Sequence, residues 1–87
     1  MKWYYVYVLR SSIDGLLYTG YSNDLKRRIE EHNAGRVSST RERRPFTLIY
    51  SEACLNQWDA LAREKYLKSG MGKKFLRSRL KSYFENL

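Results

Sequence analysis

Apolar and aromatic residues fall into three short runs with the length and composition of β-strands. The first run, Trp3–Arg10, is β-branched and aromatic almost throughout, which indicates a strand buried on both faces. The turn pair Asp14-Gly15 separates it from a second run, Leu16–Tyr21, so the two are expected to form a hairpin. A third run, Phe46–Ala53, follows later in the chain. The pattern therefore predicts a small sheet that begins with a hairpin.

The turn leaves two strand registers open, Arg10 opposite Gly15 or Ile13 opposite Leu16. In both registers, odd positions of the first strand share a face with even positions of the second, because directly paired residues lie on the same side. This parity places three tyrosines on one face of the sheet: Tyr5, Tyr7 and Tyr18.

The residues that follow the hairpin are spaced as in an α-helix. The segment Ser22–Asp24 offers good N-cap residues, and the helix is expected to run to about Ala34, before Gly35. The next stretch, Arg36–Pro45, has few apolar residues and four arginines, so we expect an exposed loop there.

Two further helices are expected after the third strand. Asn56 caps the first, which is expected to end near Ser69. The second covers about Lys73–Asn86. Its inner apolar stripe is expected to consist of Leu76, Leu80, Tyr83 and Leu87. The elements thus follow the order strand, strand, helix, strand, helix, helix, in a single α/β (α+β) domain over residues 1–87.

The charge of the chain points to a polyanionic partner. Lysine and arginine number 17 against nine acids, which gives a net charge of +8. Such a surplus favours nucleic acid, because neutralising phosphates releases counterions, although surplus cations can also serve solubility alone. The candidate nucleic-acid contacts belong to the first helix and the following loop: Lys26, Arg27, Arg36, Arg41, Arg43 and Arg44.

Cysteine usage and hydropathy exclude several classes. Cys54 is the only cysteine, so neither an intrachain disulfide nor a cysteine metal cage can form. The longest apolar run, Trp3–Leu9, is far shorter than the ~20 residues that cross a bilayer. We therefore expect a protein of the cytoplasm or the nucleoid with no membrane partner. The sequence does not determine the oligomeric state, and a monomer is assumed.

Candidate chemistry lies on the predicted first helix. Four of its residues fall at i, i+3, i+4 and i+7 and so share one face: Leu25, Arg28, Ile29 and His32. Taken alone, Arg28 is explained as a solvated arginine and His32 as a structural histidine. Tyr7 and Tyr18 are likewise explained as core aromatics. A helix that brings arginine and histidine beside two tyrosines on one sheet face is not required by packing.

Glu64 interrupts an apolar stripe on the predicted second helix. The stripe consists of Ala60, Leu61, Leu67 and Met71, with Glu64 in its middle. An unpaired buried carboxylate is costly, so it needs a partner. That partner is a divalent cation, or else a lysine or arginine, unless Glu64 lies at the edge of the stripe and reaches water.

These residues together resemble the GIY-YIG nuclease superfamily, and specifically its small stand-alone bacterial members of the UPF0213 type. Tyr5-Val6-Tyr7 stands where Gly-Ile-Tyr would, and Tyr18-Thr19-Gly20 stands where Tyr-Ile-Gly would. The segment Asp24–His32 is similar to the first helix of the family, and Ala60–Lys65 to the helix that holds its metal ligand. The resemblance covers essentially the whole chain, with tyrosine in place of the first glycine.

The resemblance implies a small, mostly antiparallel sheet of three strands flanked by helices. It implies that Glu64 ligates one Mg²⁺ or Mn²⁺ ion and that Arg28 stabilises the charge on the phosphate in the transition state. Tyr7 would orient or deprotonate the attacking water, with Tyr18 bonding nearby. His32 would carry a proton or contact phosphate.

The implied function is a metal-dependent endonuclease that hydrolyses DNA, structure-selective or weakly sequence-specific, in repair or processing. The residues themselves do not separate DNA from RNA. One alternative is a nucleic-acid-binding module that keeps the fold without turnover. Another is a basic subunit held within a protein complex.

Overall fold

A computed structural model describes residues 1–87 and shows a three-stranded antiparallel sheet in the order β2-β1-β3. The strands are β1 (Tyr4–Ser11), β2 (Leu17–Ser22) and β3 (Phe46–Cys54). The central strand β1 is buried from Val6 to Leu9, as its unbroken apolar run predicts. The sheet predicted from the sequence is confirmed.

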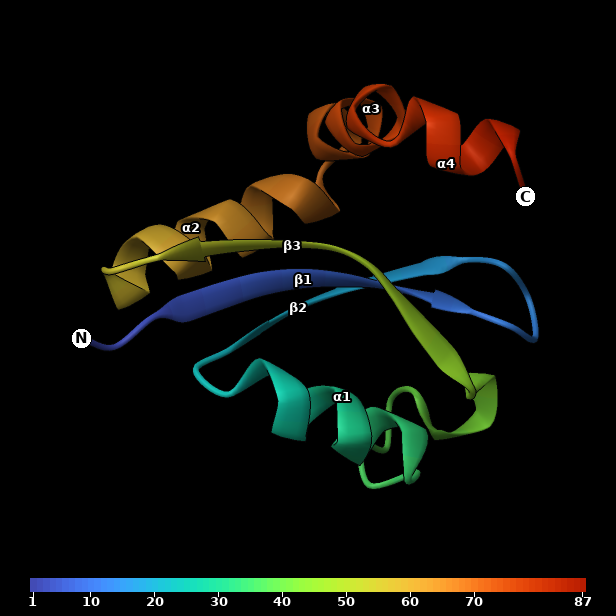
Figure 1. The fold of residues 1–87 in the computed structure, drawn as a ribbon, viewed down its shortest axis with the longest axis horizontal. Coiled ribbons are helices and arrows are strands. Elements are labelled where there is room, and N and C mark those ends of the chain that lie inside the picture. Colours follow the sequence, from blue (N-terminus) through green and yellow to red (C-terminus); the bar gives the residue numbers. More distant parts are fainter.

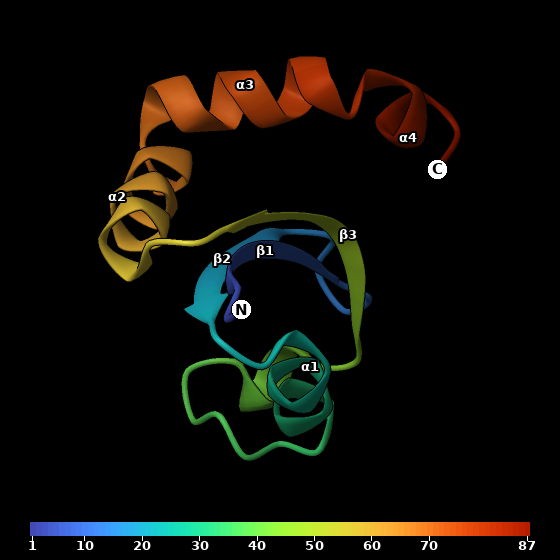
Figure 2. The same cartoon turned by 60° about the vertical axis from the view of Figure 1, so that its left-hand side comes forward.

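Helices cover both faces of this sheet (Figures 1 and 2). Helix α1 (Leu25–Asn33) lies on one face, and α2 (Gln57–Lys68) lies on the other. Helices α3 (Gly70–Arg79) and α4 (Lys81–Glu85) continue from α2 on its side of the sheet. The flanked α+β architecture is thus as expected, and no helix is long and apolar enough to cross a membrane.

Both hairpin registers expected from the sequence are wrong, although the expected parity is correct. Arg10 pairs with Leu17, which lies midway between the two proposed registers. A longer loop causes the difference: the Ser11 hydroxyl accepts from the amide of Ile13 at 3.0 Å, and Gly15 adopts φ +71°. The Tyr7 and Tyr18 side chains still share the face that α1 covers.

The last predicted helix is two helices, α3 and α4, which meet at Leu80. Leu76 is buried, as expected, but Leu87 is 65% exposed and contributes nothing to the inner stripe. Met71 is also 63% exposed. It belongs to α3 rather than to the stripe of α2, because Ser69 ends one helix and caps the next.

The expected exposed loop between α1 and β3 is partly buried. It contains a short 3₁₀-helix, Arg41–Arg43, and the preceding Thr40 is fully buried. Asn33 anchors the end of this loop, because its side-chain amide pairs with both backbone polar groups of Phe46. The loop therefore contributes to the packing under the sheet.

A fork of hydrogen bonds fixes α2 on the sheet. Arg63 of α2 donates to the Glu52 carboxylate of β3 through Nε at 3.0 Å and Nη2 at 2.9 Å. The same guanidinium lies 4.5 Å from the centre of the Phe75 ring in α3. Arg63 thus joins three elements, β3, α2 and α3.

Candidate active site

A phenol and an imidazole form the buried centre of the site. The Tyr7 hydroxyl lies 2.9 Å from Nε2 of His32, and both side chains are almost completely buried. Tyr7 comes from the middle of β1 and His32 from the last turn of α1. The sheet and the helix covering it therefore meet in this hydrogen bond, as the face shared by Arg28 and His32 predicts.

Thr40 fixes the proton positions in this pair. Its hydroxyl lies 2.8 Å from Nδ1 of His32 and 3.3 Å from the carbonyl oxygen of Val37, to which it donates. The hydroxyl oxygen then accepts from Nδ1–H, so Nε2 carries the lone pair and accepts from Tyr7. The result is a directed chain from Tyr7 through His32 to Thr40.

Tyr18 and Gly20 of β2 complete the walls around Tyr7. The Tyr18 ring centre lies 5.0 Å from that of His32 and 6.5 Å from that of Tyr7. Gly20 pairs with Tyr7 across the hairpin, and the phenol lies directly over it. A Cβ at position 20 would overlap the hydroxyl end of the ring, so only glycine fits there.

Burial sets the protonation states of the centre. It raises the pKa of Tyr7 to about 12, and the charges of Tyr18 and Glu64 add to this rise, whereas contact with Arg28 opposes it. Burial also lowers the pKa of His32, with a further contribution from the positive charge of Arg28. The resting proton therefore stays on the phenol, beside a neutral imidazole.

Arg28 lies at the edge of this centre. Its Nη1 donates to Glu31 one turn later in α1 at 3.1 Å, and about a third of the side chain is exposed. Its charge reaches both Tyr7 and His32, as the shifts of their pKa values show. The guanidinium is thus held in place by a carboxylate while part of its surface stays open to a ligand.

Glu64 approaches from the opposite layer. It lies on α2, its side chain is 20% exposed, and its Oε2 is 3.1 Å from the ammonium of Lys68. Its charge makes a small contribution to the raised pKa of Tyr7. Of the explanations that the sequence left open, the ion pair with lysine is the one observed, and the carboxylate also reaches solvent.

A single carboxylate of this kind fits a magnesium-type ion. No three His, Cys, Asp or Glu side chains gather into a ligand set, so the chain has no all-protein cage. Mg²⁺ keeps several waters and takes one or two carboxylates plus substrate phosphates, so a lone carboxylate such as Glu64 is compatible with a site of this kind. Lys68 is a competing cation for the same oxygen.

The six cations expected to contact nucleic acid differ in whether they are already bonded within the protein. Lys26, Arg36 and Arg44 are exposed and form no ion pair, whereas Arg27 lies 3.9 Å from Asp24. Arg41 donates to a backbone carbonyl. Arg43 pairs with Asp14 at 3.0 Å and lies over the Phe46 ring, so it stabilises the fold.

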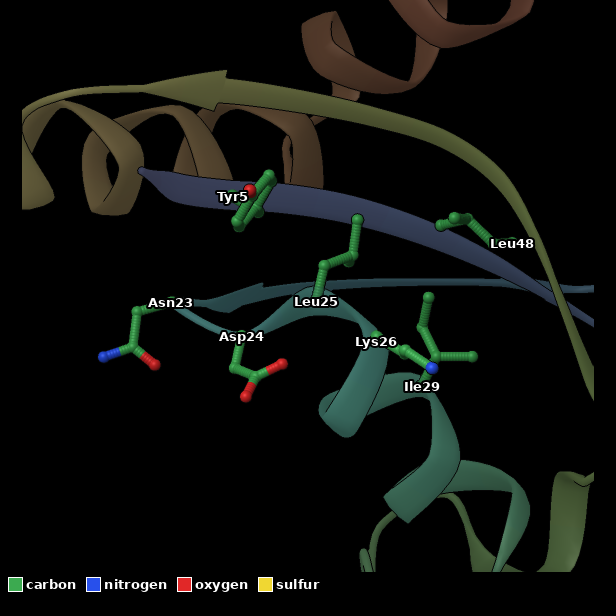
Figure 3. A pocket seen from close by; sticks show the side chains of 7 residues that line it. All are labelled: Tyr5, Asn23, Asp24, Leu25, Lys26, Ile29 and Leu48. Carbon is green, nitrogen blue, oxygen red and sulfur yellow. The ribbon is translucent and has the colours of Figure 1, made fainter. Parts of the chain in front are cut away.

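The largest hollow of the molecule, about 560 Å³, is lined by none of the candidate catalytic residues (Figure 3). It lies between β1, β3 and the start of α1, and Tyr5, Leu25 and Leu48 line it. Its carboxylate, Asp24, accepts a hydrogen bond from the amide of Arg27 as the N-cap of α1. Tyr5, which replaces the first glycine of the family motif, lines this hollow rather than the tyrosine–histidine centre.

Sequence reasoning missed Thr40 and Lys68. Thr40 lies eight residues beyond His32, after the end of α1, and no helical or strand period links the two. Lys68 follows Glu64 at i+4, the spacing of helical ion pairs, so the pattern of α2 contains the information needed to predict it.

Comparison with known proteins supports the sequence resemblance. The model of the GIY-YIG catalytic domain family matches residues 3–76. A UPF0213 protein of Streptococcus agalactiae is 48% identical over 65 residues, which cover 74% of this chain and 73% of that protein. A UPF0213 protein of Staphylococcus aureus is 41% identical over 78 residues, covering 88% and 94% respectively.

A solved structure resembles the fold as well. The solution NMR structure of the UPF0213 protein BH0048 from Bacillus halodurans has a TM-score of 0.55 and 38% sequence identity. The alignment covers 87% of this chain and 83% of that one. The likeness therefore extends over the sheet and the helices on both of its faces.

Proposed function

The chain belongs to the GIY-YIG catalytic domain family, and from this premise we propose that it is a metal-dependent endonuclease that hydrolyses phosphodiester bonds in DNA. The observation that carries the proposal is the buried hydrogen bond between Tyr7 and His32, with the charges of Arg28 and Glu64 acting on it from opposite layers. A folded core does not require two opposite charges around a buried phenol. A reaction that moves protons and develops negative charge can use both the positive and the negative group.

In the proposed mechanism, Tyr7 and His32 relay a proton. The phenol oxygen takes a proton from the attacking water while its own proton passes to Nε2 of His32. The oxygen of the water then forms a bond to phosphorus as the bond to the leaving oxygen breaks. The leaving oxygen takes up a proton from solvent, and the proton on His32 returns to solvent by way of Tyr7. Thr40 holds His32 in the tautomer that can accept, because it occupies the Nδ1 side of the ring.

The charged residues would act on the phosphate. Arg28 would bind the non-bridging oxygens, where negative charge grows in the transition state. Glu64 would hold one Mg²⁺ or Mn²⁺ ion, which would add positive charge at the phosphate and promote loss of a proton from water. Tyr18 would limit access to the phenol and bond to the substrate beside it.

We further propose that cutting is structure-selective or weakly sequence-specific and serves DNA repair or processing in the cytoplasm or nucleoid. The exposed cations suit phosphates, which position a nucleic acid but carry no sequence information. A monomer containing a single domain over residues 1–87 is proposed as the active form.

A binding module without turnover is the second candidate. The ion pair of Glu64 with Lys68 favours it, because the ammonium already neutralises the proposed metal ligand. The raised pKa of Tyr7, about 12, favours it too, since a phenol that keeps its proton is a poor base. Binding in EDTA without cleavage of any DNA in Mg²⁺ or Mn²⁺ would establish this candidate.

A cleavage assay separates the two candidates. Supercoiled, branched and single-stranded DNA are incubated with Mg²⁺ or Mn²⁺, and nicked products are measured for the wild type and for Glu64→Gln and Arg28→Ala. Loss of the metal ligand or the cation is expected to lower the rate by at least ~100-fold, the usual size of such electrostatic terms. Lys65→Gln is the matched control, because Lys65 lies next to Glu64 but is exposed. Full activity in both site variants would refute the assigned roles.

A further inference from the structure

A groove runs along the outer edge of β2 and is lined on its other side by α3. It consists of two hollows of about 320 and 270 Å³, which share Leu17 and Lys73. The first hollow also includes Leu16 and Arg77. The second continues past Tyr18 to Lys68 at the end of α2. We name these two hollows the β2–α3 groove.

Two of the three cations that line this groove form no ion pair, whereas Lys68 is paired with Glu64. Lys73 and Arg77 lie one helical turn apart on α3, both are exposed, and neither forms an ion pair. No aspartate or glutamate lines either hollow. The arginine-rich loop differs, because Arg41 and Arg43 are bonded within the protein. A polyanion thus finds unpaired positive charge in the β2–α3 groove.

The groove shares one side chain, Tyr18, with the candidate active site. Tyr18, which lines its second hollow, lies against the His32 ring at a centre-to-centre distance of 5.0 Å. Lys68, on the opposite wall, contacts Glu64. One neighbour of the tyrosine–histidine centre and one neighbour of the carboxylate thus line the same end of the groove.

We propose that the β2–α3 groove binds the DNA strand on one side of the phosphodiester bond that is cut. This inference rests on the proposed function, because it places the groove relative to that bond. Lys73 and Arg77 bind backbone phosphates, while the exposed Leu16 and the adjoining Leu17 contact the apolar faces of the sugars.

Binding measured without catalysis tests the groove. Fluorescence anisotropy of a labelled DNA duplex, and of its separated strand, is recorded in EDTA over a series of salt concentrations. For the Lys73→Ala/Arg77→Ala variant, the affinity is expected to fall by about 10- to 100-fold. The slope of log K against log salt should fall by ~1.4–1.8, since each lost phosphate contact accounts for ~0.7–0.9.

The matched control is Lys74→Ala/Lys81→Ala, which removes the same charge from exposed positions outside both hollows. It is expected to change the slope by less than half as much, and circular dichroism verifies the fold of each variant. Equal slopes of log K against log salt for the two double variants would overturn the proposal that the groove binds DNA. Wild-type protein that binds no DNA would instead refute the proposed function, so the two failures are distinguishable.

Discussion

At the scale of single residues, Thr40 decides which nitrogen of His32 faces Tyr7. Its hydroxyl occupies the Nδ1 side of the ring at 2.8 Å, and no water is needed to complete the chain of hydrogen bonds. The direction of these hydrogen bonds therefore depends on Thr40, whose side chain does not contact the phenol. Thr40 acts as a positioning residue for the proton relay.

Replacing Thr40 with valine tests this role. Valine keeps the shape but leaves the Nδ1 proton of His32 unpaired, which is expected to cost about 1–3 kcal/mol in the free energy of unfolding. The ¹⁵N shifts of His32 should show that the Nδ1–H tautomer is no longer dominant, and the nicking rate should fall by about tenfold or more. Thr40→Ser, which retains the hydroxyl, should stay close to wild type in both measurements. Unchanged ¹⁵N shifts in the valine variant would contradict the assignment.

The pH dependence of stability reports on His32. Its pKa is lowered from 6.5, first by burial and then by the charge of Arg28. Below pH 6.5 the unfolded chain therefore binds a proton that the folded chain binds only at lower pH, so stability decreases as the pH falls through this window. Urea unfolding between about pH 7 and pH 5 isolates this residue, because His32 is the only histidine. An NMR titration of its ring with a midpoint at or above 6.5 would show the explanation to be wrong.

At the scale of elements, local patterns predict which residues form strands and helices but not how the segments between them fold. Parity follows from strand geometry alone, so the shared face of Tyr7 and Tyr18 is predictable. The register is not, because Ser11 and the ion pair between Asp14 and Arg43 shape the hairpin loop through residues far away in the sequence. The hydrogen-bond partner of His32 could not be predicted from local patterns either, because Thr40 lies in a polar loop that follows α1.

The junction of α2 and α3 depends on one glycine. A Cβ at Gly72 would overlap the backbone of Tyr66 and Leu67, whereas a Cβ at Gly70 would meet nothing within 4 Å. Gly72→Ala is therefore expected to destabilise the protein by about 1–3 kcal/mol, as overpacked sites do, and to move α3 away from the end of α2. Gly70→Ala, in the same helical turn, should leave stability unchanged or slightly raised. Chemical denaturation of the pair measures the difference, and equal stabilities would contradict the close approach.

At the scale of the whole molecule, the sheet separates the two halves of the site. The tyrosine–histidine centre lies under α1, and Glu64 lies on α2, on the other face (Figure 2). Neither layer contains the complete set of residues. The two layers come together at the edge of β2, where residues of β2, α2 and α3 line the β2–α3 groove. Folding of the sheet is thus a precondition for assembling the site, and a fragment with one layer is expected to be inactive.

The C-terminal helix α4 is peripheral to this arrangement. It contains no buried residue and lies beyond residues 3–76, which match the family model. Deleting residues 81–87 is expected to cost less than about 1 kcal/mol, which corresponds to a fall in Tm of less than about 8 °C. Differential scanning calorimetry of the shortened chain provides the measurement. A larger fall would mean that Tyr83 and Phe84 stabilise the core, where they are only half-buried.

The edge position of β2 has a consequence for self-association. An outermost strand presents unpaired amide and carbonyl groups, which another polypeptide can use to extend the sheet and aggregate. Lys73 and Arg77 stand beside that rim, and a second copy carries the same surplus of eight positive charges. Repulsion between copies therefore opposes self-association and leaves the edge of β2 accessible. The same cations that would attract a polyanion thus also oppose aggregation of the protein through this edge.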